Sequence, residues 1–242
     1  MPAVRENPSL EQRSEQVLSI FRDYIDRFGD FPYKKYLAVF TDKSPEGYYI
    51  TGSSAHEIGF AGPVAVEYTF LAHEIFHVWN AGIIKQKSNY EGWFKEGFTQ
   101  YYGYLTPYRI DLYSEDKFLE HLENDYQEYI DRYESGKDMT LSKVKEELAR
   151  QEGHEHGESL RLMTMYFKGP LVAALMDREI RNITNDEKDL DDLMRKMFNK
   201  FRNRKYSSQD IMVTLNEVTG YDFTEFFSNF VYGRSKLPPI TD

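Results

Sequence analysis

Apolar side chains recur at helical intervals through most of this 242-residue chain, and this periodicity predicts a mainly helical protein. The pattern is clearest after about residue 66. One apolar stripe spans residues 118–133, a second spans 190–201, and a third runs from Ile211 to an expected stop at Gly220. Such stripes are typical of helix faces turned toward a core. Asp222 and Glu225 are expected to cap a last short helix.

An additional helix is indicated near the N-terminus. Ser9 and Gln12 have the spacing of a capping box, and Gly29 stands where a helix would stop. Between them, apolar residues at helical spacing predict the buried face: Leu10, Val17, Leu18, Phe21, Ile25 and Phe28.

Strand-like segments follow this helix. Tyr36–Thr41 and Tyr48–Thr51 are rich in aliphatic and aromatic residues, with a turn signal between them, and Gly52–Pro63 is typical of a loop or edge strand. We therefore expect a predominantly helical α+β fold in a single domain. Its expected extent is residues 1–242, with a small mixed α/β portion at 1–65 and a helical portion at 66–242.

The most informative motif is His73-Glu74-Ile75-Phe76-His77. Residues four apart on a helix share one face, about 6 Å apart along the axis, so both imidazoles can bind one metal ion. Glu74 projects about 100° round the helix from His73 and suits a general base. For this motif alone, two core histidines are the alternative interpretation.

A third ligand strengthens the metal hypothesis. Eighteen residues separate His77 from Glu96, which a second helix could present to the same ion. Catalytic zinc usually has three protein ligands and one position open to water. Two neutral histidines and one carboxylate leave zinc with net positive charge, which lowers the pKa of its water to about 7. We predict one Zn²⁺ per chain, bound by His73, His77 and Glu96.

At these motifs the sequence resembles the catalytic domain of the glycyl aminopeptidase family of zinc metallopeptidases, which are thermolysin-like enzymes with two histidines and a glutamate as ligands. The resemblance extends from about residue 31 to residue 238. It implies that His73, His77 and Glu96 are the zinc ligands and that Glu74 is the general base. The resembling segments are 73–80, 93–102, 166–169, 190–194, 226–227 and 231–233.

The resemblance also implies roles for residues outside the ligand set. Tyr166 matches the tyrosine that hydrogen-bonds the oxyanion of the tetrahedral intermediate. By itself it would be one of 19 tyrosines and most simply a core residue. Asn80, Trp93 and Thr99 are expected to orient or pack the ligands without being catalytic.

The sequence departs from the family pattern in two places. Relatives usually carry a β-rich domain and a peptide-binding PDZ domain, for which these 242 residues have no room. The family's Gly-Gly-Leu-Glu-His motif, whose acid holds the substrate's free amine, is matched by Gly52–His56, with Ala55 in place of the acid. We expect His56 and Glu57 to contact substrate, and Glu57 or Glu67 to replace the missing anchor.

Composition excludes several other functions. The chain has no cysteine, so disulfides, iron–sulfur clusters, thiolate zinc sites and a cysteine nucleophile are all ruled out. A net charge of -10 argues against a nucleic-acid partner. No apolar stretch suits a signal peptide or a membrane span, so we expect a cytoplasmic protein without membrane contact. His121 is expected on the surface, and His154 and His156 in a solvated loop.

Together these features predict a zinc metallopeptidase whose substrate is a peptide and which acts by metal-activated water. An aminopeptidase that releases small N-terminal residues is the favoured form. Three alternatives remain: a zinc endopeptidase without free-amine preference, a metal-loaded module that binds peptides without cleaving them, and a zinc hydrolase of non-peptide substrates. The sequence does not indicate an oligomeric state.

Overall fold

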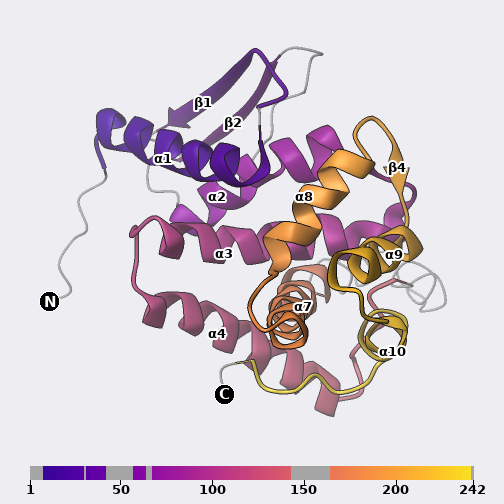
Figure 1. Ribbon diagram of the computed structural model, residues 1–242. Coiled ribbons are helices and arrows are strands. Elements are labelled where there is room, and N and C mark those ends of the chain that lie inside the picture. Colours follow the sequence, from indigo (N-terminus) through magenta and orange to yellow (C-terminus); the bar gives the residue numbers. More distant parts are fainter. Residues whose placement is uncertain (1–7, 30, 42–56, 64–66, 143–163, 241–242) are drawn as a thin grey trace, which may run out of the picture.

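The computed structural model describes residues 8–29, 31–41, 57–63, 67–142 and 164–240 (Figure 1). Within them the fold is mostly helical, as the periodicity predicted. Several sequence predictions lie outside the described residues: the strand at 48–51, the turn before it, His56, His154 and His156.

Helix α1 (Leu10–Phe28) has the predicted capping box, in which the Ser9 hydroxyl accepts from the Gln12 amide and the Gln12 side chain accepts from the Ser9 amide. It ends at Gly29, whose φ of +84° suits glycine. The predicted apolar face was partly wrong. Val17, Phe21 and Phe28 are buried, but three others are exposed: Leu10, Leu18 and Ile25.

The sheet consists of two parallel strands among the described residues, β1 (Lys35–Thr41) and β2 (Glu57–Pro63). Lys35 lies opposite Glu57 and Thr41 opposite Pro63. The first strand begins one residue before the predicted one, and part of 52–63 is indeed an edge strand. A second, very short parallel pair joins β3 (Lys85–Gln86) to β4 (Lys205–Tyr206).

The remaining elements are helical. The α-helices are α2 (Tyr68–Phe76), α3 (Thr99–Arg109), α4 (Glu115–Glu134), α7 (Gly169–Thr184), α8 (Leu190–Lys200), α9 (Ser208–Thr219) and α10 (Thr224–Phe226). Four short segments are π-helical: η1 (Val78–Ile83), η3 (Trp93–Phe98), η4 (Thr164–Lys168) and η5 (Phe227–Val231); η2 (Asn89–Glu91) is a 3₁₀ turn.

The end of α9 and the start of α10 differ in how well the sequence predicted them. Gly220 ends α9 in the left-handed region at φ +71°, as expected. The predicted cap by Asp222 and Glu225 was partly right. Asp222 accepts hydrogen bonds from the amide and hydroxyl of Thr224, the first residue of α10. The N-cap position itself is held by Phe223, which makes no side-chain cap bond.

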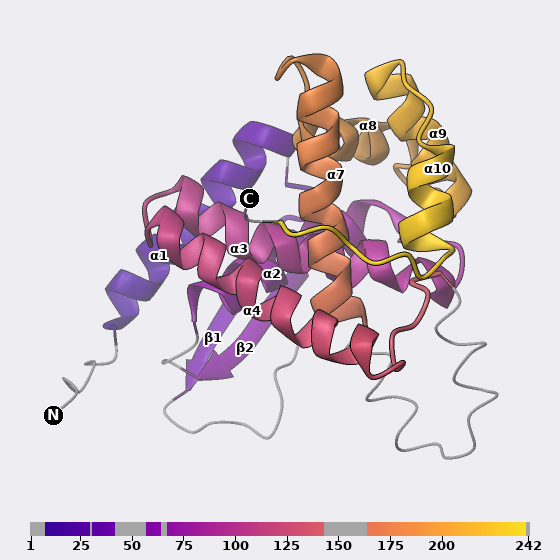
Figure 2. The same cartoon turned by 90° about the horizontal axis from the view of Figure 1, so that it is seen from below.

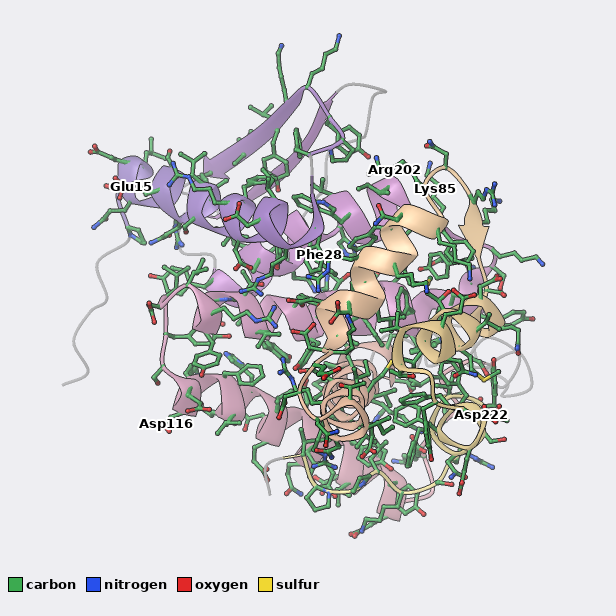
Figure 3. All side chains as sticks on the ribbon, viewed as in Figure 1. Glu15, Phe28, Lys85, Asp116, Arg202 and Asp222 are labelled. Carbon is green, nitrogen blue, oxygen red and sulfur yellow. The ribbon has the colours of Figure 1, made fainter. Side chains whose placement is uncertain are left out.

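From top to bottom in Figure 1, the sheet and α1 are followed by α2, α3 and α4, and Figure 2 shows α7 crossing over α3 and α4. Aromatic rings join these layers. Phe76 of α2 stacks on Tyr102 of α3 with centroids 4.4 Å apart, and Phe28 of α1 contacts both Tyr102 and Phe198 of α8. Phe28 points into this interior, whereas Glu15 and Asp116 lie on the periphery (Figure 3).

A buried carboxylate links three of the same helices. Asp191 of α8 is 1 % exposed and accepts a 2.7 Å hydrogen bond from Tyr102. Arg27 of α1 and Arg109 of α3 lie 3.0 and 3.1 Å from its two oxygens. Two cations and a hydroxyl thus satisfy the charge that burial would otherwise destabilise. Across the described residues, no helix is long and apolar enough to span a bilayer.

Candidate metal centre

The predicted ligands converge on one point. Nε2 of His73 and Nε2 of His77 are 3.1 Å apart, and Oε2 of Glu96 lies 3.6 Å from the first and 3.3 Å from the second. In the part of the chain that the structure describes, this is the one cluster of three histidine or acidic side chains close enough to share a metal ion.

Helix α2 positions the two histidines. His73 lies in its last turn and His77 directly follows its last residue, with the His77 amide donating to the His73 carbonyl at 3.3 Å. The two side chains are therefore one turn apart on the same face. Both are buried, at 4 and 5 % exposure.

Glu96 reaches the site from a π-helical turn, η3. Asn80, fully buried in η1, donates from Nδ2 to the carbonyls of Phe94 and Lys95 at 3.0 and 3.2 Å. The Thr99 hydroxyl also donates to the Lys95 carbonyl and accepts from Asn80 at 3.2 Å. Asn80 and Thr99 thus fix the backbone immediately before Glu96, in a type of turn that is frequent at functional sites.

Trp93 contributes packing at the start of η3. Its ring is fully buried against Phe98 and Phe227, and its indole N–H donates to the Ser208 hydroxyl at 3.2 Å. The turn is therefore anchored on α9 and η5. Trp93 therefore acts on the site through the position of η3.

The electrostatics keep the ligands ready for a cation. Burial lowers the pKa of His77 to about 4, against the opposing effect of its hydrogen bond with Glu96. His77 is therefore neutral at pH 7 and has a lone pair. Burial alone would raise the pKa of Glu96, but hydrogen bonds with His73 and His77 outweigh it and hold that pKa well below its usual range.

These observations are what a zinc site requires. Two imidazole nitrogens and one carboxylate oxygen form a donor set used in catalytic zinc sites. The donor chemistry, the neutral His77 and the convergence of three lone pairs all fit Zn²⁺.

Glu74 lies beside the ligands without belonging to the cluster. Its side chain is largely buried, and its Oε2 has no hydrogen-bond partner in the described part of the chain. Burial raises the pKa of Glu74, and the charge of Glu96 raises it further. A carboxylate with a raised pKa is better matched to proton transfer near neutral pH than an ordinary one.

Tyr166 reaches the same site from η4. Its hydroxyl donates to Oε2 of Glu96 at 2.9 Å, and its ring lies 5.9 Å from that of His73. Two residues later, the buried Lys168 ammonium lies 2.8 Å from Asp138 and donates to the Met139 carbonyl at 3.0 Å. This ion pair holds the end of η4 against the segment that follows α4.

Two glycines allow η3 to touch the chain where η4 meets α7. A Cβ atom placed on Gly97 would lie 2.5 Å from the Cα of Gly169, and one placed on Gly169 would lie 2.7 Å from the Cα of Gly97. Both separations are too short for real side chains. The backbones that carry Glu96 and Tyr166 are therefore in direct contact.

The sequence profile of the peptidase family M1 domain matches residues 65–230, which include His73, Glu74, His77, Glu96 and Tyr166. The chain belongs to peptidase family M1. The match bears out the resemblance to zinc metallopeptidases at the level of this family, and it does not confirm the narrower resemblance to glycyl aminopeptidases. No curated protein sequence matches the chain.

Solved M1 structures share the fold. An aminopeptidase N family protein from Idiomarina loihiensis has 17 % identity and a TM-score of 0.78, over 97 % of this chain and 44 % of its own. An M1 zinc metallopeptidase from Deinococcus radiodurans has 16 % identity and a TM-score of 0.69, over 100 % and 48 %. Yeast LTA4 hydrolase in complex with bestatin has 17 % identity and a TM-score of 0.63, over 93 % of this chain and 36 % of its own. The chain spans less than half the length of these proteins.

The substrate-contact residues expected in this M1 domain are less well placed than the ligands. Glu57 is the first residue of β2, and its side chain is outside the described part, as is all of His56. Glu67 is exposed at the N-cap of α2. The expectation for His121 was wrong: it is half-buried, and its ring stacks on that of Tyr104 at 4.8 Å.

Two further residues of this M1 site were not identified from the sequence. Tyr36 on β1 lies close to Glu74. Burial raises the pKa of Tyr36, and the nearby Glu74 carboxylate charge raises it further. Lys95 places its Nζ 2.8 Å from Oε1 of Glu96. Lys95 directly precedes a predicted ligand, and that adjacency was the signal available in the sequence.

Proposed function

We propose that this chain is the catalytic domain of a zinc-dependent peptidase, most closely an aminopeptidase, with a thermolysin-like arrangement of ligands. The observation that carries this proposal is the convergence of Nε2 of His73, Nε2 of His77 and Oε2 of Glu96 within 4.8 Å of one another. Glu74 beside this cluster and Tyr166 in contact with it supply the other groups that peptide hydrolysis needs.

His73, His77 and Glu96 would hold one Zn²⁺. When bound, zinc supplies a Lewis acid that polarises the substrate carbonyl and lowers the pKa of water. Membership of the M1 family and the zinc metallopeptidases among its structural neighbours support this choice of metal.

Glu74 moves the proton. Its carboxylate removes a proton from the attacking water as the water oxygen bonds to the peptide carbon. It then gives that proton to the leaving nitrogen as the C–N bond breaks, so it ends as it began. Its Oε2 has no partner among the residues that the structure describes, which leaves a lone pair for this transfer. The same carboxylate does not need to bind the metal.

Tyr166 donates a hydrogen bond to the carbonyl oxygen as negative charge develops on it. A donor aimed at that charge stabilises the transition state more than the ground state. Its hydroxyl already lies 2.9 Å from the ligand oxygen of Glu96 and is therefore beside the reaction centre. The resemblance in sequence supports this role over that of a core tyrosine.

Peptides are the proposed substrates. One structural neighbour, an M1 zinc metallopeptidase mutant from Deinococcus radiodurans, was solved bound to a Tyr-Ser-Ala substrate. A preference for a free N-terminus with a small first residue requires an acid that pairs with the substrate ammonium. Since Ala55 stands where the glycyl aminopeptidases have this acid, Glu57 and Glu67 are the proposed replacements.

The test compares turnover of free and N-acetylated peptides by the metal-loaded protein, with Glu74→Gln as the matched inactive control. Cleavage of free peptides, lost in Glu57→Ala or Glu67→Ala, supports an aminopeptidase with a relocated anchor. Equal cleavage of free and acetylated peptides indicates an endopeptidase. Peptide binding with zinc present and no cleavage indicates the non-catalytic module and contradicts the proposal.

A further inference from the structure

The two oxygens of Glu96 have different partners. Oε2 faces the histidine nitrogens and accepts from Tyr166, whereas Oε1 lies 2.8 Å from the ammonium of Lys95. The carboxylate is mostly buried, with 14 % of its side chain exposed, and the lysine side chain is 34 % exposed. A carboxylate with one oxygen already paired is oriented before any metal arrives.

This pairing is unusual for neighbours in sequence. Consecutive residues of a helix point about 100° apart and do not normally contact each other. Here the Lys95 side chain turns back onto the residue that follows it. The backbone of Lys95, from which this side chain extends, is held in place because Asn80 and Thr99 both donate to the Lys95 carbonyl. The backbone that positions Glu96 therefore also positions Lys95.

We propose that Lys95 is a positioning residue that keeps Glu96 a one-oxygen ligand. While its ammonium occupies Oε1, only Oε2 is available to the ion shared with His73 and His77. The lysine charge also offsets that of the carboxylate, so the protein ligands donate less negative charge to the metal. A fourth position is thereby kept for water and substrate, as catalytic zinc sites require. The inference rests on the proposed metal site.

The test uses the protein loaded with Co²⁺, which binds nitrogen and oxygen donors as zinc does and absorbs visible light according to its coordination number. Lys95→Met removes the charge at similar length, Lys95→Arg retains it, and Lys85→Met is the control at an exposed lysine of β3. Metal content is measured on every variant beside the spectrum.

We expect Lys95→Met to keep one Co²⁺ per chain while its visible absorption falls several-fold, because a second carboxylate oxygen raises the coordination number. Peptidase activity with zinc should fall by about 10-fold, the usual effect of losing a partner of a ligand. Lys95→Arg and Lys85→Met should keep the spectrum of the unmodified protein.

An unchanged spectrum in Lys95→Met overturns the proposal while leaving the metal site intact. A different result shows failure of the site itself: if the unmodified protein does not hold Co²⁺, or if Glu96→Ala holds it with the same spectrum, then Glu96 is not a ligand and both proposals fall. Because Lys95 is partly exposed, its variants are expected to fold, and far-ultraviolet circular dichroism checks this.

Discussion

Gly97 and Gly169 are in backbone contact, so close that a Cβ atom on either residue would lie within 2.7 Å of the Cα of the other. One glycine directly follows Glu96, the proposed ligand, and the other follows Tyr166 by three residues. Their contact sets the distance between η3, which carries Glu96, and η4, which carries Tyr166. It is therefore the structural reason that the Tyr166 hydroxyl reaches Glu96 at all.

Gly97→Ala should push η3 and η4 apart. We expect it to destabilise the protein by roughly 1–3 kcal/mol, the usual cost of overpacking, and to lower activity even where the protein remains folded. Urea unfolding and activity per folded molecule measure the two effects. Gly220→Ala is the control. It strains a residue with left-handed backbone, but the added Cβ would have no atom within 4 Å, and the position is far from the proposed ligands in sequence. A fully active Gly97→Ala protein would contradict the role of the contact.

Metal content tests the ligand assignment. Protein purified without added metal should contain one zinc per chain, and His73→Ala and Glu96→Ala should lose it, because each variant lacks one of three ligands. Elemental analysis measures this directly. His121→Ala removes a histidine outside the cluster and should keep its zinc. Retention of zinc by both ligand variants would show that the assignment is wrong.

Glu74→Gln should separate catalysis from metal binding. It removes the base without removing a ligand, so zinc should remain while turnover falls by roughly 10²-fold or more. Steady-state kinetics on a free dipeptide and elemental analysis of the same sample measure both. Loss of zinc in this variant would instead make Glu74 part of the ligand set.

Tyr166→Phe should also keep its zinc. The hydroxyl acts mainly on the transition state, so kcat should fall by roughly 10²-fold while KM changes little. The phenyl ring preserves the packing against His73, which makes the substitution conservative for stability. Full activity in this variant would return Tyr166 to the role of a core side chain.

Asp125 should make stability depend on pH. It is 4 % exposed between α3 and α4, and its Oδ2 has no partner among the described residues. Burial raises the pKa of Asp125 from 3.8 to about 8, despite a hydrogen bond from Tyr104. Between these values the unfolded chain releases a proton that the folded chain keeps, so the contribution to stability falls as pH rises.

Asp125→Asn imitates the neutral carboxylic acid and should remove this pH dependence. At pH 7 we expect a gain on the order of 2 kcal/mol, with a smaller gain at pH 5. Urea denaturation at both pH values measures the difference. The matched control is Asp116→Asn at an exposed position of the same helix. An equal effect of Asp125→Asn at pH 5 and pH 7 would show that Asp125 is ionised in the folded protein.

Features set by near neighbours in the chain could be predicted. The cap at Ser9, the stop at Gly220 and the shared helix face of His73 and His77 each depend on residues within four positions. The exposure of three apolar residues of α1 could not be predicted, because an apolar stripe does not show how much of its width the neighbouring helices and strands will cover. Leu10 and Leu18 belong to the stripe yet lie beyond the packed face, at 65 and 50 % exposure.

Features set by distant residues also could not be predicted. The parallel pairing of β1 with β2 and the stacking of His121 on Tyr104 join segments that carry no signal for each other. The π-helical turns were missed because five or six residues are too few to distinguish their period from that of an α-helix. The position of Lys95 depends on such a turn, so it was missed too.

The π-helical turns make the chemistry depend on the number of residues in the chain as well as on their identity. Each such turn contains about one residue more than an α-helical turn. Deleting one residue from Trp93–Phe98 would leave α3 able to form but would rotate the preceding residues by about 100° relative to it. A protein with the same three ligands and a turn one residue shorter would keep the helices and lose the site. A single insertion or deletion at η1, η3 or η4 is therefore expected to disrupt the proposed site while the surrounding helices still form.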